Sequence, residues 1–172
     1  ATLATVWAAS DIQAAVAWSG KITDETMRRQ IITHIGTTWG AIEPDGALNW
    51  LYSLPSQLAA NGIAGAFNSW AATDATALRE WVDSTHVSED MDQARLALAE
   101  VTSDTDPLAS LDLAAQLSSE HGRDDATARF FRHWRKTDDA AAQEWLIQTW
   151  ANLAPSTRIR LTREQKRLIA AR

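Results

Sequence analysis

Tryptophan recurs in this chain at a fixed spacing, and that spacing constrains the fold more than any other feature. Of the nine tryptophans in 172 residues, eight form four pairs whose members lie 11 residues apart. The pairs begin at Trp7, Trp39, Trp70 and Trp134, at intervals of 32, 31 and 64 residues. A fixed period of about 32 residues is typical of a repeat array, in which each repeat is one supersecondary unit.

Each pair belongs to the longer motif W-x3-[DE]-x2-[AG]-x3-W, in which an acid and a small residue stand between the aromatic residues. A further copy is in register at Thr102 and Leu113, where both aromatic residues are missing. In four of the five copies, Ser or Thr directly precedes an Asp, a combination that favours a helix N-cap. The motif therefore predicts that helices start at its acids, which are Asp11, Glu43, Asp74, Asp106 and Asp138.

Apolar residues follow each acid at helical spacing. In the second copy Pro44 suits the first position of a helix, and Pro55 is suited to end it. Another helical stripe follows at once, so that each copy is a helical hairpin. The predicted first helices are 10–20, 43–54, 74–85, 106–118 and 138–152, and the predicted second helices are 24–39, 56–71, 88–102, 123–136 and 156–171. Residues 1–8 resemble the end of an earlier second helix, which implies an upstream repeat or a cleaved segment.

A single hairpin is too thin to bury its apolar side, so the hairpins must stack on one another. The small residue of the motif would let a neighbouring helix approach closely. We therefore expect an all-α fold, a right-handed α-solenoid of about five stacked hairpins that forms one domain over residues 1–172. The repeats are about 7–38, 39–69, 70–101, 102–133 and 134–172, and the last ends in a basic capping helix.

The repeated tryptophans are interpreted as core residues, because equivalent positions in every unit suit contacts between repeats. The alternative is that they stack on carbohydrate or on nucleic-acid bases. In the fourth copy, Phe130 and Phe131 could fill the space of the missing rings. Trp150 lies outside the repeat and is a candidate contact for a partner.

Charge is divided unevenly along the chain, whose net charge is −6. Residues 1–127 contain 6 Lys/Arg and 18 Asp/Glu, whereas residues 128–172 contain 10 and 4. The basic end is either a solvated helix surface or a surface that meets phosphates or an acidic protein. Nucleic acid is the less favoured partner, since the interleaved aromatic residues of single-strand binders are absent. The candidate contacts here are Arg129, Arg132, Arg158, Arg160 and Arg163.

The sequence shows no motif for catalysis, a cofactor or a metal. It has no cysteine, its four histidines lack metal-ligand spacing, and phosphate-binding and nucleophile-elbow motifs are absent. Carboxylate pairs such as Asp124-Asp125 stand at helix starts, where capping explains them, and Gly62 and Gly65 fit close helix packing. No apolar run reaches the roughly 20 residues that cross a bilayer. We expect a protein that is not an enzyme and needs no cofactor.

The segment from Glu43 to Pro55, EPDGALNWLYSLP, resembles the D-P-x-x-A-x-x-W-x-x-x-L-P repeats of uncharacterised bacterial proteins. In size and logic the array also resembles tetratricopeptide and Sel1-like α-solenoids. The tetratricopeptide pattern W-x2-L-G-x2-Y is absent, and the period is shorter than its length of about 34 residues. The resemblance implies a bacterial source and a helical-repeat scaffold without a catalytic residue.

These features together predict a non-catalytic scaffold or adaptor that binds a peptide or protein along one solenoid face. If the first helices line that face, the contact residues are Gln13, Asn49, Arg79 and Gln143. The alternative is a structural subunit, or a regulatory or targeting domain, of a larger bacterial complex. Such a domain would dock through its basic end, and the alternative includes a membrane-associated complex. The sequence does not distinguish a cytoplasmic protein from a periplasmic or exported one.

Overall fold

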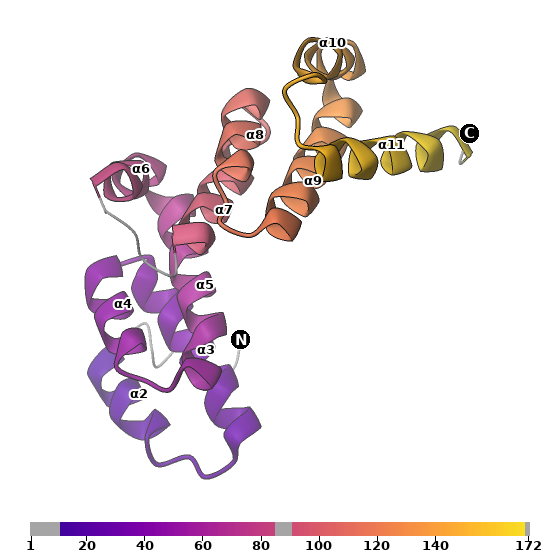
Figure 1. The fold of residues 1–172 in the computed structure, drawn as a ribbon. Helices are drawn as coiled ribbons and strands as arrows, with labels where there is room; N and C mark the ends of the chain where they lie inside the picture. Colours follow the sequence, from indigo (N-terminus) through magenta and orange to yellow (C-terminus); the bar gives the residue numbers. More distant parts are fainter. Residues whose placement is uncertain (1–10, 85–90, 171–172) are drawn as a thin grey trace. The chain divides into compact units, whose positions relative to one another are not determined.

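The fold of the chain is all-α, as the sequence predicts. The computed structural model describes residues 11–84 and 91–170, with side chains as far as residue 163, and in these ranges it has ten helices and no strand (Figure 1). The first helices are α2 (Ile12–Ser19), α4 (Pro44–Tyr52), α6 (Ala75–Ser84), α8 (Pro107–Ala115) and α10 (Asp139–Thr149). The second helices are α3 (Glu25–Gly40), α5 (Ser56–Thr73), α7 (Met91–Thr102), α9 (Glu120–Thr137) and α11 (Pro155–Ala170).

All ten predicted helices are present, with ends that differ by a few residues. Three features of the sequence prediction lie outside the described residues: Trp7, the helix end in residues 1–8, and the start of the predicted helix 88–102. The chain divides into two compact units, residues 1–97 and 98–172, which are described separately below. The single domain of five stacked hairpins stays a prediction.

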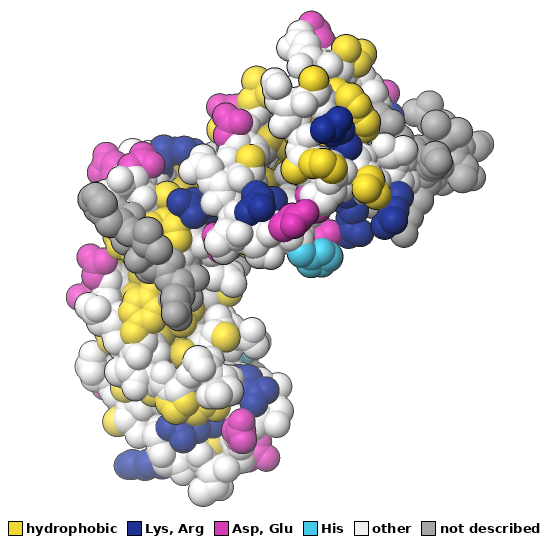
Figure 2. Space-filling model, in the orientation of Figure 1, with side chains coloured by type: hydrophobic (Ala, Val, Ile, Leu, Met, Phe, Trp, Pro, Cys, Tyr) yellow, Lys and Arg dark blue, Asp and Glu magenta, His cyan; other side chains and the backbone are white. Residues whose placement is uncertain are grey.

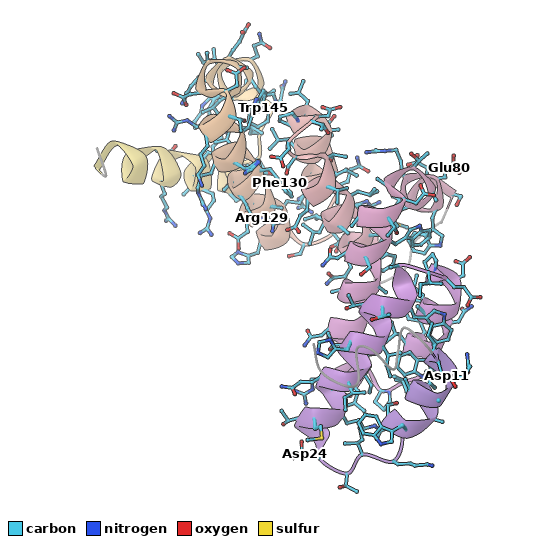
Figure 3. All side chains as sticks on the ribbon, turned by 180° about the vertical axis from the view of Figure 1, so that it is seen from behind. Asp11, Asp24, Glu80, Arg129, Phe130 and Trp145 are labelled. Atoms are coloured by element: carbon cyan, nitrogen blue, oxygen red, sulfur yellow. The ribbon has the colours of Figure 1, made fainter. Side chains whose placement is uncertain are left out.

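The acid of the motif forms a corner before each first helix, and this corner has nearly the same backbone in all five copies. The φ angles of these residues lie between −153° and −143°, and the ψ angles between 80° and 87°. At Asp11, Asp74, Asp106 and Asp138 the carboxylate accepts a hydrogen bond of 2.9–3.0 Å from the backbone N–H three residues later. The N-cap prediction is confirmed, and the starts of α2 and α3 are visible at Asp11 and Asp24 in Figure 3.

The small residue of the motif belongs to the same corner. In the four copies with Asp it is the alanine whose backbone N–H donates to the carboxylate. In the second copy it is Gly46, where an added Cβ would lie 3.0 Å from both the Trp39 ring and the Glu43 carboxyl group. In this copy the neighbour that needs the space is the Trp39 indole ring at the end of α3.

In the three pairs that the described residues contain in full, the two tryptophans meet across the corner. Trp39, Trp70 and Trp134, at the ends of second helices, are 7–8% exposed. Their partners on the next first helix are half-buried, and the ring centroids lie 5.9–6.3 Å apart. Such tilted aromatic pairs add to the free energy of burial. The core interpretation is thus confirmed for these pairs, whereas Trp18 is 36% exposed.

The fourth corner replaces its aromatic pair with buried hydroxyl groups. Ser110 is fully buried, its hydroxyl donates to the Ala99 carbonyl oxygen at 2.8 Å, and it lies 3.0 Å from the Thr102 hydroxyl. Phe131 packs on Trp145 of the next copy, with centroids 5.8 Å apart. Phe67 occupies the equivalent position against Trp81, at 5.4 Å. Phe131 therefore belongs to the aromatic cluster of the fifth copy, whereas filling of the fourth corner by Phe130 and Phe131 stays a prediction.

Within the first unit, the second helices α3 and α5 form the most extensive contact (Figure 1). Glycine brings their backbones together: a Cβ on Gly36 would lie 2.8 Å from the Gly62 carbonyl oxygen, and one on Gly65 would lie 2.2 Å from Thr37. This confirms close packing at Gly62 and Gly65. In the second unit, α9 contacts α8, α10 and α11.

Candidate functional site

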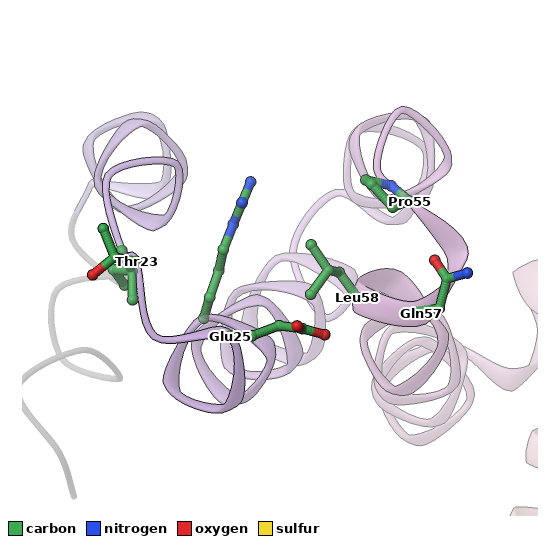
Figure 4. A pocket seen from close by; sticks show the side chains of 7 residues that line it. Thr23, Glu25, Pro55, Gln57 and Leu58 are labelled. Atoms are coloured by element: carbon green, nitrogen blue, oxygen red, sulfur yellow. The ribbon is translucent and has the colours of Figure 1, made fainter.

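The first unit has a surface cavity of about 400 Å³ between the beginnings of α3 and α5. Its lining combines charged and polar residues with three apolar ones: Ile22, Thr23, Glu25, Arg28, Pro55, Gln57 and Leu58. Leu58 is buried and points from α5 toward α3, while Glu25 extends from α3 toward α5 (Figure 4). Pro55 is the N-cap of α5 and gives that helix no side-chain cap.

Arg28 is the unusual residue of this cavity. It is half-buried, and its Nε atom is buried without a hydrogen-bond partner. Among the described residues, no carboxylate pairs with its guanidinium group. The neighbouring Arg29, in contrast, binds the Glu25 carboxylate at 2.9 Å. The cavity thus contains a cation whose charge is not balanced by a direct contact.

The second unit has a cavity of about 280 Å³ between the beginnings of α9 and α11. It is lined by His121, Asp124, Asp125, Ser156, Ile159, Arg160 and Arg163. Both cavities lie where the N-terminal turns of two successive second helices meet. A surface feature therefore recurs at corresponding places in the two units.

Four charged or titratable residues of the second cavity make polar contacts within the unit: His121, Asp124, Asp125 and Arg160. Asp124 is 9% exposed, and its carboxylate accepts hydrogen bonds from the hydroxyl groups of Thr157 at 2.5 Å and Ser156 at 3.2 Å. Asp125 pairs with Arg160 and lies 3.1 Å from the Nε2 atom of His121. The contacts of Asp124 with Ser156 and Thr157, and of Asp125 with Arg160, join α9 to α11, which indicates that much of this polar cluster is structural.

The residues predicted to line a first-helix face lie outside both cavities. Gln13 and Asn49 are exposed on α2 and α4, and Arg79 is half-buried on α6. Gln143, half-buried on α10, can accept hydrogen bonds from Arg135 once its amide is oriented to suit them. Gln143 therefore has a contact within its own unit, and neither cavity brings the four residues together.

The predicted basic contacts are mostly engaged within the second unit. Arg129 pairs with Glu100 and stacks on Phe130, with its guanidinium carbon 4.7 Å from the ring centroid. Arg158 donates to the Leu153 carbonyl oxygen at 3.0 Å. Arg132 lies on α9, where it also has an interaction.

The remaining two predicted basic contacts, Arg160 and Arg163, both line the second cavity. Figure 2 shows Lys and Arg side chains interspersed with hydrophobic ones on the visible face of this unit. Trp150, at the C-cap of α10, is 37% exposed.

The described residues contain no group of three or more His, Asp or Glu side chains that could hold a metal ion. None of the helices in the described ranges combines the length and the apolar character needed to cross a membrane. Comparison of the sequence with family models, with curated proteins and with solved structures gives no match.

Sequence reasoning did not find the first cavity. Its residues come from two stretches about 30 positions apart, and neither contains a motif. One signal was available: Arg28 is one of only 6 basic residues in the acidic stretch 1–127. A half-buried cation that has no carboxylate partner, although it lies in an acidic segment, is a candidate for ligand binding.

Proposed function

We propose that this protein is a non-catalytic helical-repeat scaffold that binds a peptide segment of a protein partner. In this proposal the hairpins, about five in number, continue as a right-handed solenoid. The repeated corner supports the proposal, because nearly identical backbone angles precede all five first helices of the described residues. The close contacts of α3 with α5 and of α9 with α11 support stacking of successive hairpins.

The observation that carries the binding function is the cavity that recurs where successive second helices begin. Repeat proteins use such recurring surface features to hold an extended ligand, one segment per repeat. The proposed binding surface is therefore formed by the N-terminal ends of the second helices and the loops before them. The first-helix face, with Gln13 and Asn49, is the competing surface.

The test is selection from a random-peptide display library against the intact chain. We expect enrichment of a short consensus, confirmed with synthetic peptides by calorimetry. Substitution of Leu58 or Arg163 at the cavities should weaken binding, whereas the matched change Asn49→Ala on α4 should leave it unchanged. If no peptide is enriched, the proposed function is wrong. If only Asn49→Ala weakens binding, the ligand lies on the first-helix face.

The alternative of a subunit that docks through its basic end has less support from the contacts. Arg129 and Arg160 already pair with carboxylates of the same unit, so their charges are largely compensated. Arg163, which is exposed at the second cavity, is the basic side chain best placed to meet an acidic surface there. Such docking would weaken with added salt and with Arg163→Gln.

A further inference from the structure

We propose that the cavity between α3 and α5 binds a carboxylate group, carried by a peptide next to an aliphatic side chain, and that Arg28 is its main contact. This inference rests on the proposed function, which it deepens by naming the chemistry of the ligand at one cavity. The group could be the C-terminal carboxylate of a peptide or the side chain of Asp or Glu. Both share the planar anion that a guanidinium group recognises.

Arg28 has a buried Nε atom without a hydrogen-bond partner, as do Arg29, Arg95 and Arg160. Among the described residues these other three arginines each pair with a carboxylate, whereas Arg28 has no such pair. Arg29 is paired with Glu25, so this carboxylate is already engaged. The guanidinium fork presents parallel N–H donors that fit the two oxygens of a carboxylate. An incoming carboxylate would therefore supply the contact that Arg28 lacks.

The rest of the cavity lining includes three apolar residues. Ile22, Pro55 and Leu58 line the same cavity as Arg28, and Leu58 is 7% exposed. Pockets that combine apolar walls with a few polar groups bind ligands with both characters. A cavity of about 400 Å³ is large enough for one amino-acid side chain together with a carboxylate.

The charges around the cavity favour a carboxylate over a phosphate. Glu25 lines the cavity, and Asp24 precedes it as the N-cap of α3. A phosphate carries nearly two negative charges at neutral pH and would be repelled by these carboxylates. A single negative charge is balanced by Arg28 alone. The surroundings therefore favour a monoanion.

The experiment uses the intact chain labelled with ¹⁵N and three short peptides that share an aliphatic residue. One ends in a free C-terminal leucine, the second is the same peptide as its amide, and the third is an amidated peptide with an internal glutamate. We expect saturable shifts of the backbone signals of Ile22, Arg28 and Leu58 with the first or third peptide and none with the second. Binding of the first peptide identifies a C-terminal carboxylate as the ligand, and binding of the third identifies a side-chain carboxylate. Equal shifts with the second peptide, or larger shifts with inorganic phosphate, overturn the proposal.

Variants test the role of Arg28 directly. Arg28→Gln should weaken binding of the carboxylate peptide by about tenfold or more, and Arg28→Lys should weaken it less, since it keeps the charge but loses the fork. Lys21→Gln is the matched control, because it removes one charge from a nearby exposed loop residue that does not line the cavity. An unchanged spectrum elsewhere shows that each variant is folded. If display-selected peptides bind Arg28→Gln as well as the natural chain, the scaffold function stands and this inference fails.

Discussion

The indole nitrogen of Trp39 donates a 3.0 Å hydrogen bond to the Glu43 carboxylate across the corner between α3 and α4. In the other four copies the acid is Asp, and its shorter side chain caps the next helix instead. Glu43 makes no side-chain cap, although its backbone angles match those of the other corners. One additional methylene group thus changes the partner of the acid without changing the corner.

The Trp39–Glu43 hydrogen bond leads to the first prediction. Glu43→Ala removes the acceptor of a buried indole and should lower the free energy of unfolding by about 1 kcal/mol. Glu43→Asp exchanges the indole bond for a helix cap and should change stability by less than about 0.5 kcal/mol. Urea denaturation followed by tryptophan fluorescence and by circular dichroism measures both effects. Equal losses in the two variants would show that the cap cannot replace the indole bond.

The second prediction concerns the capping carboxylates. Asp74 is the single residue between α5 and α6, and it accepts from the Ala77 N–H at 2.9 Å. Asp74→Ala should cost about 1 kcal/mol, and Asp74→Asn should cost less because the amide oxygen can still accept. The control is Asp83→Ala in the last turn of the same helix, where the helix dipole disfavours an acid and no loss is expected. A loss at Asp83 as large as that at Asp74 would contradict a capping role.

The helices could be predicted from the sequence because the signals that start and stop them are local. An acid, a small residue and a proline act on the backbone within one turn, so the five corners are visible in the spacing of the motif. The cavities could not be predicted in the same way. Arg28 and Leu58 line one cavity because α3 and α5 pack closely, and that packing depends on the contacts of many residues along both helices. For the same reason, the spacing did not show that Phe131 contacts Trp145.

The third prediction tests the close approach of α3 and α5. A Cβ on Gly40 would lie 2.5 Å from the Cα atom of Ala66, so Gly40→Ala forces the helices apart and should cost at least about 1–3 kcal/mol. At Gly20 the nearest atom to an added Cβ is 3.6 Å away, and φ is −67°. Gly20→Ala should therefore be neutral or stabilise the chain by up to about 1 kcal/mol. Calorimetric melting of both variants makes the comparison, and equal melting temperatures would refute the packing argument.

The fourth prediction concerns the buried pair formed by Asp124 of α9 and Thr157 of α11. Asp124→Ala leaves the Thr157 hydroxyl, in a residue 6% exposed, without its 2.5 Å acceptor and should cost about 2 kcal/mol. Thr157→Val should cost less, since Asp124 keeps the Ser156 hydroxyl as a donor. The double variant should be more stable than the sum of the single losses implies, because neither group is then left unpaired. A double-mutant cycle measured by urea denaturation gives this coupling directly. Strictly additive losses would show that the two side chains act independently and that the contact does not hold α11 on α9.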